Sequence, residues 1–283
     1  MFGMSYRIRA LQALFFFILG WHLSACIREE LVDLPEQYTT PRLFVYGVLS
    51  VDDWIRIYVA QTVPYGKADF QQDDFRVDDA VVTLRAADGR ETALHRNPDD
   101  PFVFQVRQST FPVIIGQTYH LRVEAPGFTP VTASTTVPAE RADWKRLSLM
   151  SAGDGEYVVN GYWDALPNDQ LYGYGVVYSY DDKAPIGHGN EGIARVDGGY
   201  TVQYDLYMGS RDAVRVLLLT RDEHFSAYSK ASELATDVAL NYTNAYFVDF
   251  ISGFKGVFPH YSNIEGGAGL FGSFRISSQM LYK

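Results

Sequence analysis

The sequence predicts an all-β protein: an immunoglobulin-like or transthyretin-like sandwich followed by a β-rich C-terminal domain with one helix. Short runs of β-branched and aromatic residues recur along the chain and are separated by Gly, Pro, Asn and Asp turns. Aromatic residues make up 15% of the chain, with 20 tyrosines and 18 phenylalanines, a richness common in exported β proteins. No repeat of fixed period occurs, which excludes solenoids and propellers.

The first predicted element is a lipoprotein signal peptide over residues 1–25. Arg7 and Arg9 precede an apolar stretch, which ends in Leu23-Ser24-Ala25 directly before the only cysteine, Cys26. A charged start, a short apolar core and small residues before a cut are the marks of a secretory signal. The apolar stretch is shorter than the roughly 20 residues that span a bilayer. We therefore expect cleavage before Cys26 and lipidation of its thiol.

Residues 26–41 are expected to form a tether. They include Pro35 and Pro41 and show no sustained period, as in a linker that holds a domain away from a membrane. Stable anchoring takes more than one acyl chain, which a triacylated cysteine provides. The mature chain would thus be anchored to a membrane without crossing it.

Residues 42–138 carry the alternation typical of a small sandwich of about seven strands. The clearest hairpin signal is Asp88-Gly89 between two apolar runs. The charged stretch 139–145 would end this domain. The expected strands are 42–50, 54–61, 80–86, 91–95, 102–106, 118–125 and 131–137.

Residues 139–283 are expected to form the second domain. Its expected strands are 157–164, 171–180, 200–208, 213–220, 253–259 and 270–277. Apolar residues at helical spacing predict one helix near 221–240, and Thr220 with Glu223 has the spacing of a capping box at its start. Tyr172, Tyr174, Tyr178 and Tyr180 share one face of a predicted strand, where they either pack between sheets or form an exposed binding face.

Charge and motif content argue against several function classes. The full chain carries a net charge of −10, and cleavage removes two arginines and no acid, which leaves −12. Such a chain repels nucleic acid and anionic lipid. Histidine pairs at metal-ligand spacing and a Gly-x-Ser-x-Gly elbow are both missing from the sequence, and lipidation would remove the only thiol. We expect no enzymatic activity, no cofactor and no metal, although a triad assembled across the fold stays open.

Two features suggest a ligand but have a simpler interpretation. The glycine patterns Gly187–Gly192 and Gly267–Gly272 lack the strand and helix of a dinucleotide site, so we interpret them as turns. The paired aspartates match no regular calcium loop and are also interpreted as turns. If a cation binds, the acidic loop 66–79 is where we expect it.

Three groups of residues resemble the lipoproteins of Bacteroidota known as domain of unknown function 4249. The first is the lipobox with Asp33-Leu34-Pro35 and Arg42-Leu43-Phe44-Val45-Tyr46-Gly47. The second comprises Val81-Thr83-Leu84, Asp88-Gly89, the 116–123 strand and Ala133-Thr135-Thr136-Val137-Pro138. The third and most specific is the tail, 261–272, with Asn263, Glu265, Gly266, Gly267, Gly269 and Gly272. The stretch 258–260 departs from the family pattern.

The resemblance implies an outer-membrane lipoprotein with a non-enzymatic binding or accessory role, beside a TonB-dependent receptor in nutrient uptake. Glu29 and Glu30 resemble a signal for export to the cell surface, and Arg28 weakens that match. A surface adhesin or matrix component is the alternative, and a surface hydrolase a further one. We interpret the tail glycines as structural, with Asn263 and Glu265 tying the loop to backbone.

Overall fold

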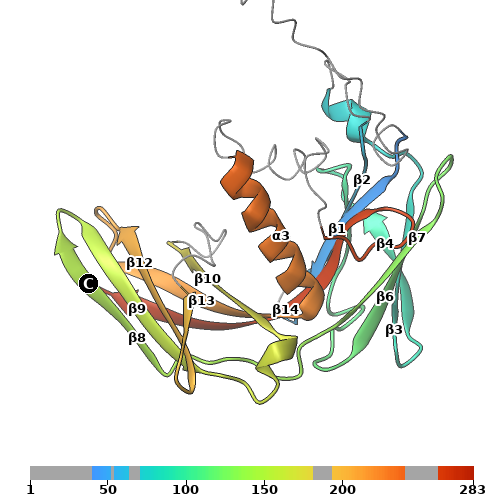
Figure 1. Ribbon diagram of the computed structural model, residues 1–283. Helices are drawn as coiled ribbons and strands as arrows, with labels where there is room; N and C mark the ends of the chain where they lie inside the picture. The colour runs from blue at the N-terminus through green and yellow to red at the C-terminus, as the bar shows by residue number, and fades with distance from the viewer. Residues whose placement is uncertain (1–39, 52–53, 64–70, 181–192, 240–260) are drawn as a thin grey trace, which may run out of the picture. The chain divides into compact units, whose positions relative to one another are not determined.

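The structure of this protein, a computed structural model, describes residues 40–51, 54–63, 71–180, 193–239 and 261–283 (Figure 1). The described strands form two sheets. Residues Glu36–Lys283 form one unit. The signal peptide, Cys26 and most of the tether lie outside the described residues, as do the expected strand 253–259 and the glycine pattern 187–192. In the part of the chain that the structure describes, no helix is long and apolar enough to cross a membrane.

The strands of the first half follow the predicted alternation closely. Val81–Ala86 and Glu91–Arg96 form the hairpin expected around Asp88-Gly89, with Val82 opposite Leu94. A 3-10 turn, η1 (Gln72–Phe75), lies between the second and third strands. The strands are β1 (Leu43–Leu49), β2 (Ile55–Gln61), β3 (Val81–Ala86), β4 (Glu91–Arg96), β5 (Val103–Val106), β6 (Thr118–Glu124) and β7 (Val131–Thr136).

The second half contains two strands that the sequence analysis missed. β8 (Arg146–Gly153) falls within a stretch treated as connecting, and its residues are mostly exposed, which hides the alternation. β11 (Ile193–Val196) is only four residues long. The other elements are β9 (Glu156–Asp164), η2 (Asp169–Leu171), β10 (Gly173–Ser179), β12 (Gly199–Tyr207), β13 (Ala213–Arg221), α3 (Glu223–Ala239) and β14 (Ala268–Tyr282).

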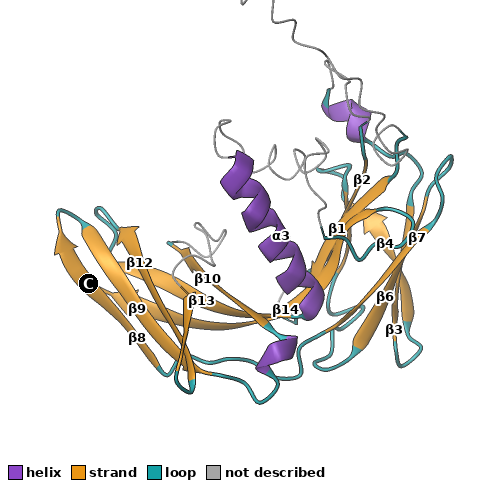
Figure 2. Cartoon of the chain, in the orientation of Figure 1, coloured by secondary structure: helices purple, strands orange, loops and turns teal. Residues whose placement is uncertain are grey.

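Among the described residues the strands form a ten-stranded sheet, β10-β13-β14-β1-β2-β5-β4-β3-β6-β7, and a four-stranded sheet, β11-β12-β9-β8 (Figure 2). β14 is far longer than the expected strand 270–277. Its first part pairs parallel with β1, Phe44 opposite Ala268, and the rest pairs antiparallel with β13, Phe274 opposite Arg221. One strand therefore belongs to both halves of the chain.

Two main hydrophobic clusters form the interior. The first is enclosed by β1 to β7 and includes Ile57, Leu84 and Tyr119, all fully buried. It also takes in Ile264 and Phe271 from the end of the chain. The second lies between the four-stranded sheet and β10, β13 and β14, around the fully buried Trp163. The predicted domain boundary at residue 138 stays a prediction. β14 contributes Phe271 to the first cluster and Leu281 to the second, so this strand packs in both clusters.

The expected helix is present, but its predicted N-terminal cap was wrong. Asp222 is the capping residue, because the amide of Phe225 donates to its Oδ1 at 2.8 Å. Thr220 instead ends up in β13, where its hydroxyl accepts from the amide of Ala142 at 2.9 Å. Thr220 and Glu223 have the spacing of a capping box, but Thr220 belongs to β13 and its hydroxyl is already hydrogen-bonded to Ala142.

The helix α3 packs on β10, β13 and β14. Glycines allow this close approach: a Cβ at Gly173 would lie 2.2 Å from Oγ of Ser226 on the helix. A Cβ at Gly272 would lie 2.9 Å from the Cβ of Phe225. The even-numbered residues of β10 face the opposite way, into the second cluster.

Candidate functional site

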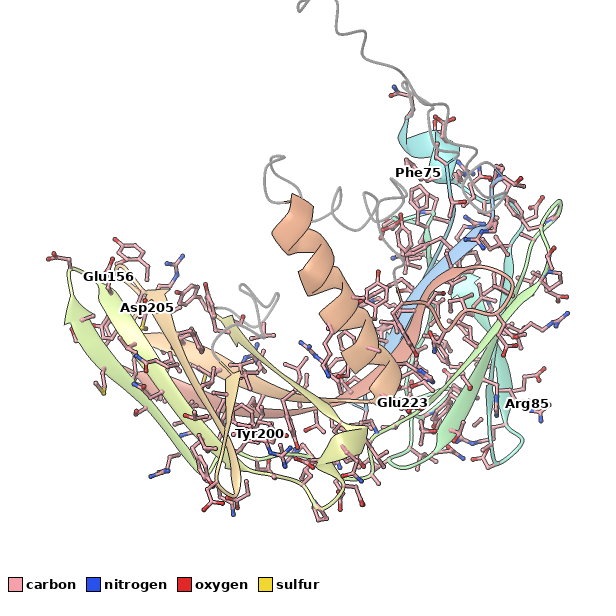
Figure 3. The ribbon with its side chains drawn as sticks, in the orientation of Figure 1. Phe75, Arg85, Glu156, Tyr200, Asp205 and Glu223 are labelled. Atoms are coloured by element: carbon pink, nitrogen blue, oxygen red, sulfur yellow. The ribbon has the colours of Figure 1, made fainter. Side chains whose placement is uncertain are left out.

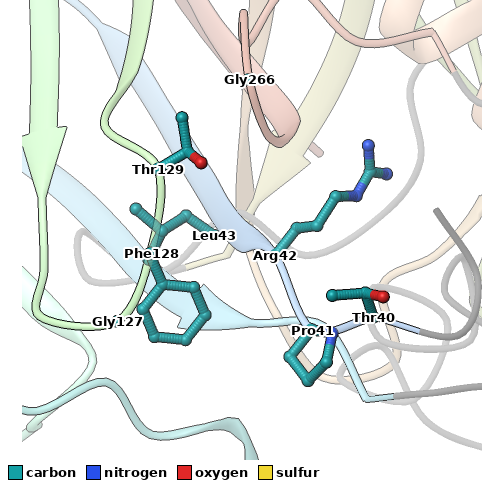
Figure 4. Close-up of a pocket in the computed structure, with 8 residues that line it drawn as sticks. All are labelled: Thr40, Pro41, Arg42, Leu43, Gly127, Phe128, Thr129 and Gly266. Atoms are coloured by element: carbon teal, nitrogen blue, oxygen red, sulfur yellow. The ribbon is translucent and has the colours of Figure 1, made fainter. Parts of the chain in front are cut away.

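An open depression of about 400 Å³ lies where three separate segments of the chain meet. The start of β1, the turn between β6 and β7, and the tail turn each supply part of its wall (Figure 4). A cavity of this size suits a small organic ligand. The lining residues are Thr40, Pro41, Arg42, Leu43, Gly127, Phe128, Thr129 and Gly266.

Arg42 gives the depression its charge. Its Nε is buried, and the described residues offer its guanidinium neither a hydrogen bond nor an ion pair. Its backbone is fixed, because its amide donates to Oγ1 of Thr62 at 3.0 Å and its carbonyl accepts from the Thr62 amide at 2.8 Å. The side chain is therefore a cation on a rigid strand end with unused donors.

The apolar wall is contributed by Phe128 and Pro41. Phe128 follows Pro126 and Gly127 in the turn between β6 and β7, and its ring lies between Gly127 and Pro41 in the close-up (Figure 4). The hydroxyl groups of Thr40 and Thr129 add polar atoms to the rim. None of the eight lining residues is acidic. A cation, an aromatic ring and two hydroxyls together suit a ligand with an anionic group on an apolar body.

The tail motif contributes Gly266 to the lining of the depression and links β7 to β14. The Nδ2 of Asn263 donates to the carbonyls of Phe271 at 2.7 Å and Ser134 at 3.2 Å, and its Oδ1 accepts from the Phe271 amide at 2.9 Å. Glu265 pairs through its backbone with Thr132, whose hydroxyl also donates to its Oε2 at 3.1 Å. These bonds link β7 to β14 and to the segment that leads into it.

The four glycines of the motif lie close to neighbouring segments of the chain. Gly266 borders the depression, and a Cβ at Gly267 would lie 2.6 Å from the carbonyl oxygen of Leu43. At Gly269, φ is +119° and a Cβ would lie 1.9 Å from the carbonyl oxygen of Val45. Gly272 contacts the helix, as described above. Only Gly266 therefore reaches a surface that a ligand could occupy.

A buried polar network lies at the N-terminus of α3. Asp222 accepts a hydrogen bond from the Thr135 hydroxyl, and its amide donates to the Ser273 carbonyl at 3.0 Å. The Thr135 and Ser273 hydroxyls are 2.9 Å apart, and the Ser273 hydroxyl donates to the carbonyl of Thr136 at 2.9 Å. Burial raises the pKa of the Asp222 carboxyl, against hydrogen bonds that lower it. The network joins β7, β14 and the helix.

This network lacks the geometry of a nucleophilic triad. Ser273 is fully buried and donates to backbone, and Asp222 contacts Thr135 in place of an imidazole. The nearby His224 has its Nδ1 2.5 Å from the hydroxyl of Tyr261. A triad needs an exposed nucleophile bonded to a histidine that a carboxylate orients. Among these residues the contacts are those of a structural junction.

The tyrosines of β10 mostly pack inward. Tyr174, Tyr178 and Tyr180 lie against the second cluster, with Tyr178 stacked on Tyr204 at 5.9 Å between ring centres. Tyr200, which Figure 3 labels on β12, stacks on Trp163 at 5.8 Å. Burial raises the pKa of Tyr174 to about 12. Of the two interpretations left open by the sequence, packing between sheets is the one that these contacts favour.

The remaining candidates sit apart from the depression. His95 and His120 are exposed on strands, and His188 and His260 lie outside the described residues. Of the acidic loop 66–79, Asp74 caps its own 3-10 turn and Asp78 pairs with Arg76 at 2.9 Å. Within the described ranges, no group of three His, Cys, Asp or Glu side chains could hold a metal ion.

The sequence analysis missed Arg42 and Phe128 as possible ligand contacts. Arg42 was noted only within the first predicted strand and the family pattern, and Phe128 was not singled out. No local pattern marks them, because strand pairing alone brings residues 42, 128 and 266 together. The tail motif was identified, but the surface that it borders was not.

Solved structures that align with this chain do so with low sequence identity and low TM-scores. A two-domain fibronectin type III segment of chicken tenascin aligns with 16% identity and a TM-score of 0.21, covering 64% of this chain and 90% of that one. Chicken CNTN1 FN1–FN3 domains align with 9% identity and a TM-score of 0.22, covering 86% and 65% respectively. TM-scores this low carry no argument. No curated protein matches the chain.

One protein-family model matches most of the chain, which is enough to assign the family. The model described as "Domain of unknown function (DUF4249)" matches residues 28–280. That range contains the described strands, except the last two residues of β14, together with the helix, the depression and the tail motif. The chain therefore belongs to the DUF4249 family.

Proposed function

We propose that this protein is a lipid-anchored outer-membrane lipoprotein of a Bacteroidota bacterium with a non-enzymatic binding role. The observation that carries the proposal is the position of its only cysteine. Cys26 directly follows Leu23-Ser24-Ala25, and the family match begins two residues later, at residue 28. A family domain whose match begins directly behind a lipobox cysteine has the order expected of a lipoprotein.

The binding role rests on the depression. It is the place where an unpaired cation, an aromatic ring and the family tail motif come together in the described part of the chain. Thr40, the first described residue, lies on its rim, only a short tether away from Cys26. In this proposal the depression takes up a ligand near the membrane surface and passes it to a TonB-dependent receptor.

The non-enzymatic part of the proposal is supported by the chemistry of the polar groups. The buried carboxylate Asp222 is committed to capping the helix and to the Thr135 hydroxyl. A hydrolase would need an accessible carboxylate or nucleophile beside the bound ligand. No described lining residue carries a carboxylate or an imidazole that could act as a base toward the Thr40 and Thr129 hydroxyls.

Anchoring is tested with Cys26→Ala, expressed in the native host and compared with Thr39→Ala in the predicted tether. The wild type and Thr39→Ala should incorporate radioactive palmitate and sediment with outer membranes, whereas Cys26→Ala should do neither. If the wild type takes up no label, or if Cys26→Ala still sediments with membranes, the proposal fails. Protease treatment of intact cells then reports whether the protein is exposed on the surface.

The partner is tested by purifying the tagged lipoprotein from detergent-solubilised envelopes. Co-purification of a TonB-dependent receptor, lost on deletion of the receptor gene, would support the accessory role. Recovery of the lipoprotein alone, or in large self-assemblies, would contradict it and favour the adhesin or matrix alternative.

A further inference from the structure

We infer that the depression is a carboxylate-binding site in which Arg42 holds the carboxylate and Phe128 with Pro41 packs against the apolar body of the ligand. This inference rests on the proposed binding role and names its ligand class. The shared chemistry is a compact carboxylic acid, supplied either as a small molecule or as the C-terminal residue of a peptide.

Arg42 differs from most of the described arginines because its side chain has no partner among the described residues. Among the described arginines, only Arg42 and Arg85 have no hydrogen bond, ion pair or ring contact of their side chains. Arg85 projects from β3 at an exposed position, where water solvates it (Figure 3). Arg42 is half-buried, and its Nε is shielded from water without a partner. Leaving a buried donor unpaired costs about 1–3 kcal/mol.

The described lining residues supply no acid of the protein's own. The chain holds 34 acidic residues against 24 basic ones, yet none of the described residues that line the depression is acidic. Glu265 adjoins Gly266 in sequence, but its Oε2 accepts from the Thr132 hydroxyl at 3.1 Å. The guanidinium of Arg42 is therefore available for an external anion.

The charge and shape of the described lining favour a carboxylate over a phosphate ester. A guanidinium offers a planar fork of donors that matches a carboxylate with two parallel hydrogen bonds. Among the described lining residues Arg42 is the only charged one, which is too little positive charge for a phosphate ester with two negative charges. Phe128 and Pro41 line the same depression, and in this inference their rings contact the rest of the ligand.

The experiment uses the mature lipoprotein in nonionic detergent and isothermal titration calorimetry. Hippurate, which joins a carboxylate to an aromatic ring, is the small-molecule probe, and its methyl ester is the neutral control. Gly-Gly-Phe and its C-terminal amide form the peptide pair. Binding of hippurate alone identifies a small acid, binding of the peptide alone identifies a peptide end, and binding of both leaves the carboxylate as the recognised group.

Arg42→Gln should weaken binding of the carboxylate probe at least about tenfold, since a charge-assisted bidentate contact is lost. Arg42→Lys should recover only part of the affinity, because an ammonium lacks the planar fork. Arg85→Gln makes the same change of charge at the exposed site and should bind as the wild type does.

The inference is overturned if neither carboxylate binds, if the ester and amide bind as well as the acids, or if Arg85→Gln weakens binding as much as Arg42→Gln. Thermal unfolding of each variant checks its folding. Should Arg42→Gln fail to fold, NMR shifts of the Phe128 and Thr129 amides on titrating the wild type locate the probe. A failed titration beside successful co-purification of a receptor rejects the ligand class alone.

Discussion

The side chain of Asn263 is hydrogen-bonded to both backbone groups of Phe271, as a neighbouring strand would be. Its Oδ1 accepts from the Phe271 amide at 2.9 Å and its Nδ2 donates to the Phe271 carbonyl at 2.7 Å. The same Nδ2 reaches the Ser134 carbonyl at 3.2 Å, on β7. One amide thus takes the place of the backbone pairing that the two strands do not make at this point.

Replacing Asn263 with Ala should destabilise the protein by about 2–3 kcal/mol, because several half-buried backbone groups lose their partners. Asn263→Asp should cost more, since a carboxylate cannot donate to the two carbonyls. Urea denaturation of the mature protein measures both. Asn168→Ala, at an exposed residue whose side chain makes no capping bond, should change stability by less than about 0.5 kcal/mol. Equal effects at the two asparagines would contradict the role given to Asn263.

Gly269→Ala should destabilise the protein by more than about 3 kcal/mol or prevent folding, since the added Cβ collides with backbone. Gly89→Ala is the matched control: its φ is +92°, and nothing lies within 4 Å of an added Cβ. That variant should cost only about 1 kcal/mol, the penalty for an alanine at positive φ. Yield and thermal unfolding compare the two, and similar losses would show that contact with Val45 is unimportant.

Asp222 should make stability depend on pH in an unusual direction. Because burial raises its folded-state pKa above the ordinary value of 3.8, the folded state binds the proton more tightly than the unfolded chain. Its contribution to the free energy of unfolding therefore falls as pH rises from 3.8 through the folded pKa. Asp222→Asn keeps the helix cap and should remove this slope in urea titrations between about pH 4 and about pH 7.

Asp88 provides the contrast for that measurement. Hydrogen bonds from Gln117 and Arg90 lower its pKa to about 2. Its contribution is therefore present above the ordinary carboxyl pKa and lost as pH falls toward about 2. Asp88→Asn should leave the slope above about pH 4 unchanged. If Asp222→Asn also left that slope unchanged, the assignment to Asp222 would be wrong.

Removing the hydroxyl of Tyr204 should be neutral or slightly stabilising. This hydroxyl is buried without a partner among the described residues, so Tyr204→Phe removes a desolvated polar group. Tyr119→Phe is the control, because the Tyr119 hydroxyl contacts the Ile114 amide at 2.7 Å and Oε1 of Gln117 at 2.9 Å. That change should cost about 1–2 kcal/mol. Thermal unfolding decides, and a large loss at Tyr204 would reveal an unrecognised partner.

The sequence predicted local elements well where one face of a strand is buried. In β6, Tyr119, Leu121 and Val123 are buried while the residues between them are half-buried or exposed, as the alternation requires. It missed β8 because that strand is mostly exposed on both faces. The helix was predicted from apolar spacing, but its cap was not, since the choice between Thr220 and Asp222 depends on where β13 ends.

The sequence by itself determined the all-β class, the hairpin at Asp88-Gly89, the helix and the family, because these depend on residues close together in the chain. Only the tertiary structure decided that Ala268 pairs with Phe44 and that Arg42, Phe128 and Gly266 share a depression. A local pattern sets which face of a strand is buried, but leaves its partner open. Pairing between segments more than two hundred residues apart is selected by the packing of the whole core, which no single stretch of sequence contains.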